Sequence, residues 1–282
     1  MTGPDHDWLT VERGEAPLIV SIPHTGTDIP PDIEAGLAGP WIARKDTDWR
    51  IEQLYGFADQ LGATVVRTAI SRTVIDVNRD PSGASLYPGR TTTELCPTTT
   101  FDGEPIYAAG REPDAAEIAR RRFRFFDPYH AALADEIVRL RDSHPRVVLY
   151  DCHSIRSVMP RLFDGELPVM NIGTNSGRSC DPALQGRIEQ DCAASPFSWV
   201  ANGRFTGGWI TRSHGRPADG IDAVQMELSC RGYLREPIGA VDEGIWPVPY
   251  DPAFAVPMRE TLTRILQACI EYCGGIDRRV VP

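Results

Sequence analysis

The chain has 282 residues, of which 41% are hydrophobic and 24% charged. This composition is typical of a folded protein with a large core, and it excludes disorder over the whole chain. Acidic residues outnumber basic ones by 39 to 29, so the net charge is −10 and a nucleic-acid-binding role is disfavoured. We find no repeat or linker, and we expect one domain over residues 1–282.

Cysteine usage and hydropathy indicate the compartment. The seven cysteines are scattered without a CxxC pair, and the polar start of the chain carries no secretory signal. No apolar run approaches the ~18 residues of a membrane span. We therefore expect a cytoplasmic protein with neither a membrane nor nucleic acid as partner. The basic run of residues 120–124 is predicted to be a solvated helix face.

Short apolar runs alternate along the chain with longer helical patterns. The strand candidates are residues 18–22, 64–68, 73–77, 147–150, 168–172 and 223–226. Most are apolar at consecutive positions, as expected of strands covered by helices on both faces. The helical patterns are residues 49–61, 113–142, 182–194 and 252–273. This alternation predicts an α/β fold with a mixed, mainly parallel sheet.

Three local signals refine this prediction. Asp251 is expected to cap the last helix, and Pro128 is expected to kink or divide the long middle one. Residues 80–110 are rich in Pro, Gly and Thr and have no clear period. A long irregular stretch of this kind in a compact domain is typical of a functional lid or wall, or of disorder, against which Tyr87, Phe101 and Tyr107 argue.

Polar residues follow four of the predicted strands. His24 comes after the first, His153 after residues 147–150, the Asn78-Arg79 pair after residues 73–77, and Glu227 directly after residues 223–226. Ligands of open α/β sheets bind at the carboxyl ends of strands, so these side chains are expected to converge.

Two histidines and a carboxylate form a typical ligand set for a catalytic zinc ion, with a fourth position left for water. His24 and His153 supply the imidazoles. Either Asp46 or Asp48 is placed to supply the carboxylate. The alternative role for Asp48 is to cap the helix that begins near Trp49.

The remaining charged residues suggest acid–base and anion-binding roles. Glu227, at an apolar strand end, is a candidate general base with a pKa raised by burial, and the alternative is an ion pair with Arg231 or another arginine. A guanidinium group matches a carboxylate, so Arg72 and Arg79 are candidates for binding an anionic substrate. The alternative is structural ion pairing with Asp76 or Asp80.

Two other mechanisms find little support in the sequence. Cys152 adjoins His153, but neighbours on a strand point to opposite faces, so we expect a buried thiol and not a thiol hydrolase. No GxGxxG or P-loop pattern is present, so nucleotide binding is not predicted.

Several segments together resemble one known family. The chain is similar to the N-formylglutamate amidohydrolases from about residue 17 to 233, and the similarity rests on many short motifs in order. They are residues 21–26 (SIPHTG), 46–49 (DTDW), 71–79 (SRTVIDVNR), 86–89 (LYPG), 91–97 (TTTELCP), 101–105 (FDGEP), 151–157 (DCHSIRS), 161–165 (RLFDG), 203–205 (GRF), 207–208 (GG) and 225–228 (QMEL).

The resemblance implies a fold, a reaction and a set of roles. The fold would be a zinc-carboxypeptidase-like sheet of about eight strands between helices. The reaction would be the hydrolysis of N-formyl-L-glutamate, a small dicarboxylate, to formate and L-glutamate in histidine degradation. The implied roles are zinc ligation by His24, Asp48 and His153, substrate carboxylate binding by Asn78 and Arg79, general-base catalysis by Glu227, and polarisation of the scissile carbonyl by Arg72.

Two positions depart from the related patterns. Thr27 stands where carboxypeptidases have their carboxylate ligand, so Asp48 is chosen and Asp46 is kept in reserve. Ser213-His214 stands where the family more often has His-Tyr, so no role is assigned to His214. The alternatives are another metal-dependent amidase or deacylase on this scaffold, and a binding protein without catalysis.

Overall fold

The computed structural model describes residues 7–274, and residues 1–6, on which the targeting expectation partly rested, lie outside this range. The described residues form one sheet of seven strands in the order β1-β3-β2-β4-β7-β5-β6. The strands are β1 (Leu9–Glu12), β2 (Leu18–Ile22), β3 (Thr64–Thr68), β4 (Val147–Ile155), β5 (Met170–Gly173), β6 (Trp199–Ala201) and β7 (Ile221–Ser229). Only the β1–β3 and β5–β7 pairs in this sheet are antiparallel, so the predicted mixed, mainly parallel sheet is confirmed with one strand fewer than expected.

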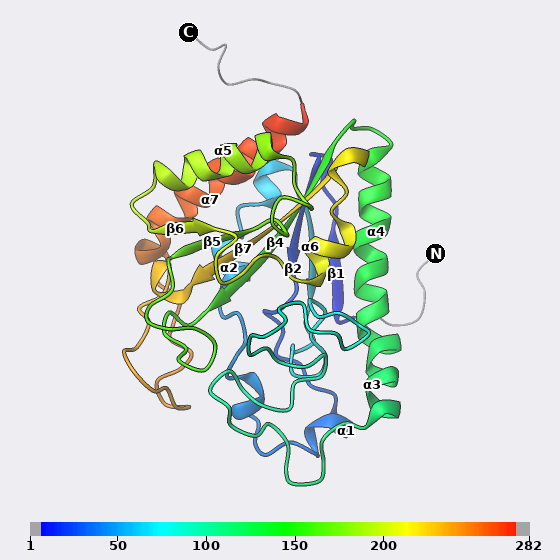
Figure 1. Ribbon diagram of the computed structural model, residues 1–282, viewed down its shortest axis with the longest axis vertical. Coiled ribbons are helices and arrows are strands. Elements are labelled where there is room, and N and C mark those ends of the chain that lie inside the picture. Colours follow the sequence, from blue (N-terminus) through cyan, green and yellow to red (C-terminus); the bar gives the residue numbers. More distant parts are fainter. Residues whose placement is uncertain (1–6, 275–282) are drawn as a thin grey trace.

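Helices cover both faces of the sheet (Figure 1). They are α1 (Pro31–Glu34), α2 (Ile51–Leu54), α3 (Ala115–Arg121), α4 (Asp127–Arg141), α5 (Pro182–Ala193), α6 (Trp209–His214) and α7 (Pro252–Cys273). One core lies between the sheet and α2, α5 and α7, and a second lies between the sheet and α4 and α6. Leu18 and Val20 of β2 enter the first core and Ile19 enters the second, which explains the apolar run. Within residues 7–274, none of the helices combines the length and apolar character that crossing a bilayer requires.

Most predicted elements are present, and the errors have local causes. Residues 73–77 form turns and not a strand, because their polar groups bond to side chains and to other segments: Thr73 Oγ1 donates to Ala43 O at 2.6 Å. The predicted helix of residues 49–61 is broken, since α2 ends at Leu54. The short strands β1 and β6 were not predicted.

The long middle helix is divided just before Pro128. A π-helical turn at Arg122–Phe126 joins α3 to α4, and Pro128 lies in the first turn of α4, where its missing N–H costs little. The expectation of a solvated face for residues 120–124 is wrong for Arg121. That guanidinium is buried and donates to Tyr107 Oη at 2.7 Å.

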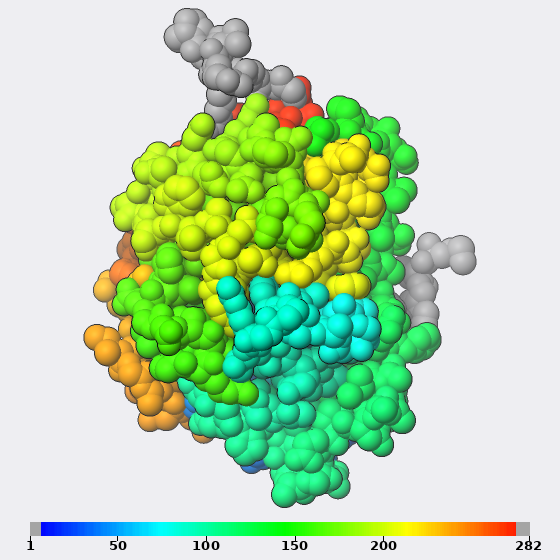
Figure 2. All heavy atoms as spheres, in the orientation of Figure 1, coloured from blue at the N-terminus to red at the C-terminus, as the bar shows by residue number. Residues whose placement is uncertain are grey.

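Residues 80–110 contain no helix or strand, as predicted, and they form a wall over the carboxyl ends of the central strands. Tyr87 Oη donates to Gly207 O at 3.1 Å, and Arg204 Nη2 donates to Thr91 O at 3.0 Å. In Figure 2 the cyan part of this segment lies against the yellow residues near 210. These contacts agree with the expectation of a lid or wall over the site.

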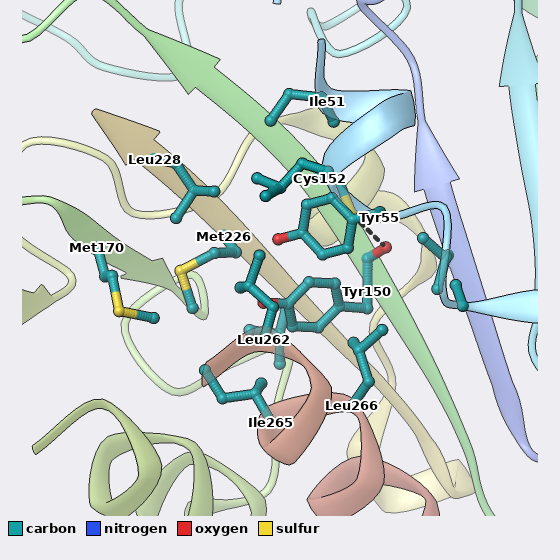
Figure 3. Packing of buried hydrophobic residues seen from close by; sticks show 14 of the residues in the cluster. Ile51, Tyr55, Tyr150, Cys152, Met170, Met226, Leu228, Leu262, Ile265 and Leu266 are labelled. Atoms are coloured by element: carbon teal, nitrogen blue, oxygen red, sulfur yellow. Dashed lines mark hydrogen bonds between the residues drawn. The ribbon is translucent and has the colours of Figure 1, made fainter. Parts of the chain in front are cut away.

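Cys152 lies in the first core and not in a polar cleft. Figure 3 shows Cys152 beside Tyr55, with a dashed line from its thiol to the backbone carbonyl of Tyr150, and 1% of the residue is exposed. Burial raises the pKa of this thiol well above its ordinary value. The prediction of a buried Cys152 is confirmed.

Candidate active site

Two neighbouring parallel strands carry much of the site. β4 and β7 both extend further than predicted, so Asp151, His153 and Glu227 lie within strands and not beyond their ends. His153 is paired in register with Glu227, and Asp151 with Gln225. Alternate residues of a strand share a face, so these four side chains point to the same side of the sheet.

His24, Asp48 and His153 converge at the carboxyl end of this sheet. His24 follows β2 by two residues, and Asp48 lies in the loop before α2. His153 Nδ1 is 3.1 Å from His24 Nδ1 and 3.2 Å from Asp48 Oδ2, while His24 Nδ1 is 3.7 Å from Asp48 Oδ2. All three residues are at least 98% buried.

The other nitrogen of each imidazole faces a carboxylate. His24 Nε2 is 2.8 Å from Asp76 Oδ1, and His153 Nε2 is 2.8 Å from Asp151 Oδ2. Because a carboxylate only accepts hydrogen bonds, each Nε2 carries the proton and each Nδ1 of a neutral ring keeps its lone pair. The two lone pairs and the Asp48 carboxylate then face one another at close range.

This arrangement fits a divalent metal ion. Zinc binds His nitrogen and carboxylate oxygen at about 2.0–2.2 Å, so the edges of a tetrahedral site are about 3.3–3.6 Å long. The three distances between the donor atoms, 3.1, 3.2 and 3.7 Å, are close to these edges. Histidine ligands of metals also donate their second N–H to a carboxylate, as His24 and His153 do here.

Arg72 joins two of the carboxylates. Its Nη1 donates to Asp48 Oδ1 at 3.0 Å and its Nη2 to Asp76 Oδ2 at 2.7 Å, while the guanidinium lies over the ring of Phe101. Burial alone would raise the pKa of Asp76, but His24 and Arg72 hold it well below its usual value. The predicted alternative of ion pairing between Arg72 and Asp76 is therefore observed. The predicted role of Arg72 in polarising the scissile carbonyl remains a prediction.

Asn78 is buried, and its side-chain amide is already engaged. Nδ2 is 2.9 Å from His153 Nε2 and 3.2 Å from Asp151 Oδ2, and Oδ1 accepts from the N–H of Ile210 at 2.8 Å. Gly208 packs directly on this amide, and a Cβ at that position would come within 2.4 Å of it. Because His153 Nε2 is itself a donor, Asn78 Nδ2 donates to Asp151, and Asn78 thereby connects the Asp151–His153 pair to α6; its predicted contact with substrate stays a prediction.

Glu227 lines the pocket next to the cluster, and it forms no ion pair with a cationic side chain among the described residues. Its Oε2 accepts from Gln225 Nε2 at 3.0 Å, whereas Arg231 pairs with Glu166, so the alternative ion pair is not formed. Burial, reinforced by the charge of Asp48, raises the pKa of Glu227 to about 7. A carboxylate with such a pKa can both accept and return a proton near neutral pH.

The two candidate aspartates differ clearly in position. Asp46 Oδ2 accepts from the N–H of Phe101 at 2.6 Å, and Asp46 is not part of the cluster. Asp48 is, and it does not cap α2, whose N-cap residue is Arg50 without a side-chain bond. The geometry therefore favours Asp48 over Asp46 for a metal.

A pocket lies in front of the cluster, and part of it is open to solvent. His24, His153 and Glu227 line it from the sheet, and residues 91–93 line it from the wall. Arg79 lines it as well, with Nη2 donating to Thr93 Oγ1 at 3.0 Å and Nε 3.4 Å from Asp76 Oδ2.

The sequence reasoning missed three roles. Asp151 and Asp76 hold the two imidazoles, and Arg204 lines the pocket. The period of two along β4 would have placed Asp151 on the face of His153 if the strand had been extended to Ile155. No local pattern marks Asp76 or Arg204, because long-range folding brings both to the site.

The known proteins that are similar to this chain belong to one family. The model of the N-formylglutamate amidohydrolase family matches residues 16–234. Curated N-formylglutamate deformylases of Pseudomonas aeruginosa and Pseudomonas putida are 42% and 43% identical, over 94% and 96% of this chain and 96% and 97% of their own. The crystal structure of N-formylglutamate amidohydrolase from Ralstonia eutropha has a TM-score of 0.76 at 23% identity and covers 95% of this chain and 99% of that one, which shows a shared fold. The chain belongs to the N-formylglutamate amidohydrolase family.

Proposed function

We propose that this protein hydrolyses N-formyl-L-glutamate to formate and L-glutamate with a divalent metal ion, zinc in the first place. The observation that carries the proposal is the pair of imidazoles whose Nε2 atoms face Asp76 and Asp151 and whose Nδ1 atoms meet Asp48. The names of the two Pseudomonas relatives support the substrate.

His24, Asp48 and His153 would hold the metal. Bound there, the ion would supply a Lewis acid that activates water and polarises the formyl oxygen. Glu227 would accept a proton from the water and return it to the nitrogen of the leaving amine, for which a pKa of about 7 is suited. Arg72 would keep Asp48 and Asp76 in place through its two ion pairs.

Arg79 would bind the α-carboxylate of the substrate. That carboxylate lies one carbon from the scissile amide nitrogen, so its partner must stand close to the metal ligands. Arg79 Nε is 3.4 Å from Asp76, which itself contacts His24.

We place this single catalytic domain in the cytoplasm, because all seven cysteines are free and buried in the described part of the chain.

Release of L-glutamate from three substrates tests the acyl group. Purified, zinc-loaded protein is given N-formyl-, N-acetyl- and N-succinyl-L-glutamate at equal concentration. We expect a preference for the formyl compound, measured as kcat/KM. Preference for a larger acyl group would support another deacylase on this scaffold, and binding of all three without turnover would support a protein that binds but does not catalyse.

A further inference from the structure

The pocket contains three arginines, and they differ in their partners. Arg72 has both terminal nitrogens bonded to carboxylates, and Arg79 shares one of those carboxylates, Asp76. Arg204 has no carboxylate within ion-pairing distance among residues 7–274, although it lines the same pocket. Its guanidinium is therefore a positive charge with unused binding capacity.

Arg204 is nevertheless held firmly in place. Its Nε donates to Leu162 O at 2.8 Å and its Nη2 to Thr91 O at 3.0 Å. Its Cζ lies 5.6 Å from the ring centroid of Tyr87 and 5.1 Å from that of Phe205. The remaining nitrogen, Nη1, makes no hydrogen bond with any described residue. An arginine fixed in this way loses little side-chain entropy when it binds a ligand.

The surroundings of Arg204 favour an anion. Burial lowers the pKa of Arg204, and the positive charges of Arg90 and Arg79 lower it further. Arg90 is close by, since its Nη1 donates to the carbonyl of Arg204 at 3.2 Å. The charge of Glu227 acts in the opposite direction, but the two side chains form no ion pair. A carboxylate bound at Arg204 would relieve this repulsion.

We propose that Arg204 binds the side-chain carboxylate of the substrate and so selects a dicarboxylate amino acid. This inference rests on the proposed function. Arg79 stands beside Asp76 near the metal ligands, as the α-carboxylate requires. Arg204 is anchored to Thr91 of the wall and to Leu162, and it forms no hydrogen bond or ion pair with the three cluster residues, as the longer reach of the side-chain carboxylate requires.

The test compares N-formyl-L-glutamate with N-formyl-L-glutamine, which has the same shape and no side-chain charge. In Arg204→Gln we expect kcat/KM for the glutamate compound to fall about 10- to 100-fold, the range of one charge-assisted interaction. The value for the glutamine compound should change less than threefold. In Arg79→Gln both values should fall together. An equal fall for both substrates in Arg204→Gln would reduce Arg204 to a structural role and overturn the proposal.

Arg212→Gln is the matched control. Arg212 also packs on Tyr87, at 5.3 Å, and donates to a backbone carbonyl, that of Gly207, but it does not line the pocket. Its variant should keep the wild-type preference for glutamate over glutamine. A loss of preference as large as that of Arg204→Gln would contradict a specific role for Arg204.

A binding measurement separates this inference from the proposed function. Calorimetry compares glutarate, with two carboxylates, and its monoamide, with one. The wild type should bind glutarate at least tenfold more tightly, and Arg204→Gln should lose that preference, whether or not the protein turns over a formyl compound. Equal affinity of the wild type for both ligands would overturn the inference. Absence of glutamate release together with a clear glutarate preference would overturn only the proposed reaction.

Discussion

His24 and His153 each turn one ring nitrogen to a carboxylate and the other to a common point. This pattern depends on residues from four separate segments, since Asp76 and Asp151 fix the imidazoles and Asp48 completes the set. The residue types could be predicted from the sequence because polar groups follow apolar strands. Their partners could not, because the contact between His24 and Asp76 spans 52 positions and leaves no local pattern.

Replacing Glu227 by Gln tests the proposed base. The amide has nearly the same shape but cannot accept a proton, so kcat should fall about 10²- to 10⁴-fold. Metal content should stay at the wild-type level, because Glu227 is not part of the three-residue cluster. Steady-state kinetics and elemental analysis of the same sample check both points. Near-normal turnover would contradict the assignment.

The pH dependence of kcat/KM tests the state of the same carboxylate. The pKa of Glu227 is raised to about 7, and a base must be deprotonated to act. Activity should therefore rise with pH, and the acid limb of the profile should have its midpoint near pH 7, or at a lower pH once a cation is bound nearby. A profile that is flat between pH 5 and 8 would exclude Glu227 as the titrating base.

Asp151 supports His153 without being a ligand itself. In Asp151→Asn the amide replaces an acceptor that lies 2.8 Å from His153 Nε2. Loss of such a partner weakens metal binding about 10- to 100-fold. Competition with a chromophoric chelator measures the zinc affinity. Asp181→Asn, in a helix N-cap away from the site, is the control. Equal affinity in both variants would show that Asp151 has no part in metal binding.

At the scale of elements, α4 and α6 are joined by two stacked histidines. His130 Nε2 donates to Val77 O at 2.8 Å, so its Nδ1 accepts from His214 Nε2 at 3.0 Å. The N–H of Ile210 in α6 donates to Asn78 Oδ1. By fixing α6, the histidine pair therefore helps to position Asn78 in the site. His214, to which the sequence assigned no role, is therefore structural.

The histidine pair makes stability depend on pH. Burial lowers the pKa of His130 to about 4 and that of His214 to about 3, from 6.5. Between pH 6.5 and 4 the unfolded chain takes up protons that the folded chain does not. The free energy of unfolding therefore decreases as the pH is lowered through this window.

In His214→Gln the amide can still donate to His130 but does not titrate. The loss of stability between pH 7 and 5 should be smaller than in the wild type by about 1–2 kcal/mol. Urea denaturation at the two pH values measures it. Equal losses in both proteins would show that His214 does not contribute to the pH dependence.

The elements themselves were predictable where local signals were strong. The last helix begins and ends as expected, because Asp251 accepts from the N–H groups of Ala253 and Phe254. Residues 73–77 were misjudged because their β-branched apolar residues imitate a strand, while Arg72 and Asp76 draw the backbone into turns. Only the ion pairs formed in the folded protein show that this segment forms turns and not a strand.

At the scale of the whole molecule, local and overall charge have opposite signs. The chain carries a net charge of −10, yet Arg79 and Arg204 line one pocket with Arg90 beside it. A dicarboxylate is thus attracted by the pocket and not by the protein as a whole. Salt should raise KM for N-formyl-L-glutamate only moderately, since half-buried charges are screened less than exposed ones.

The central claim is that His24, Asp48 and His153 hold a metal on which the hydrolysis of N-formyl-L-glutamate depends. The most direct measurement is L-glutamate release by the wild type and by His153→Ala, before chelation, after chelation and after zinc is restored, with zinc content determined each time. We predict that the wild type loses and regains activity with zinc, and that His153→Ala neither retains zinc nor recovers. Wild-type activity that persists after complete removal of metal would contradict the claim.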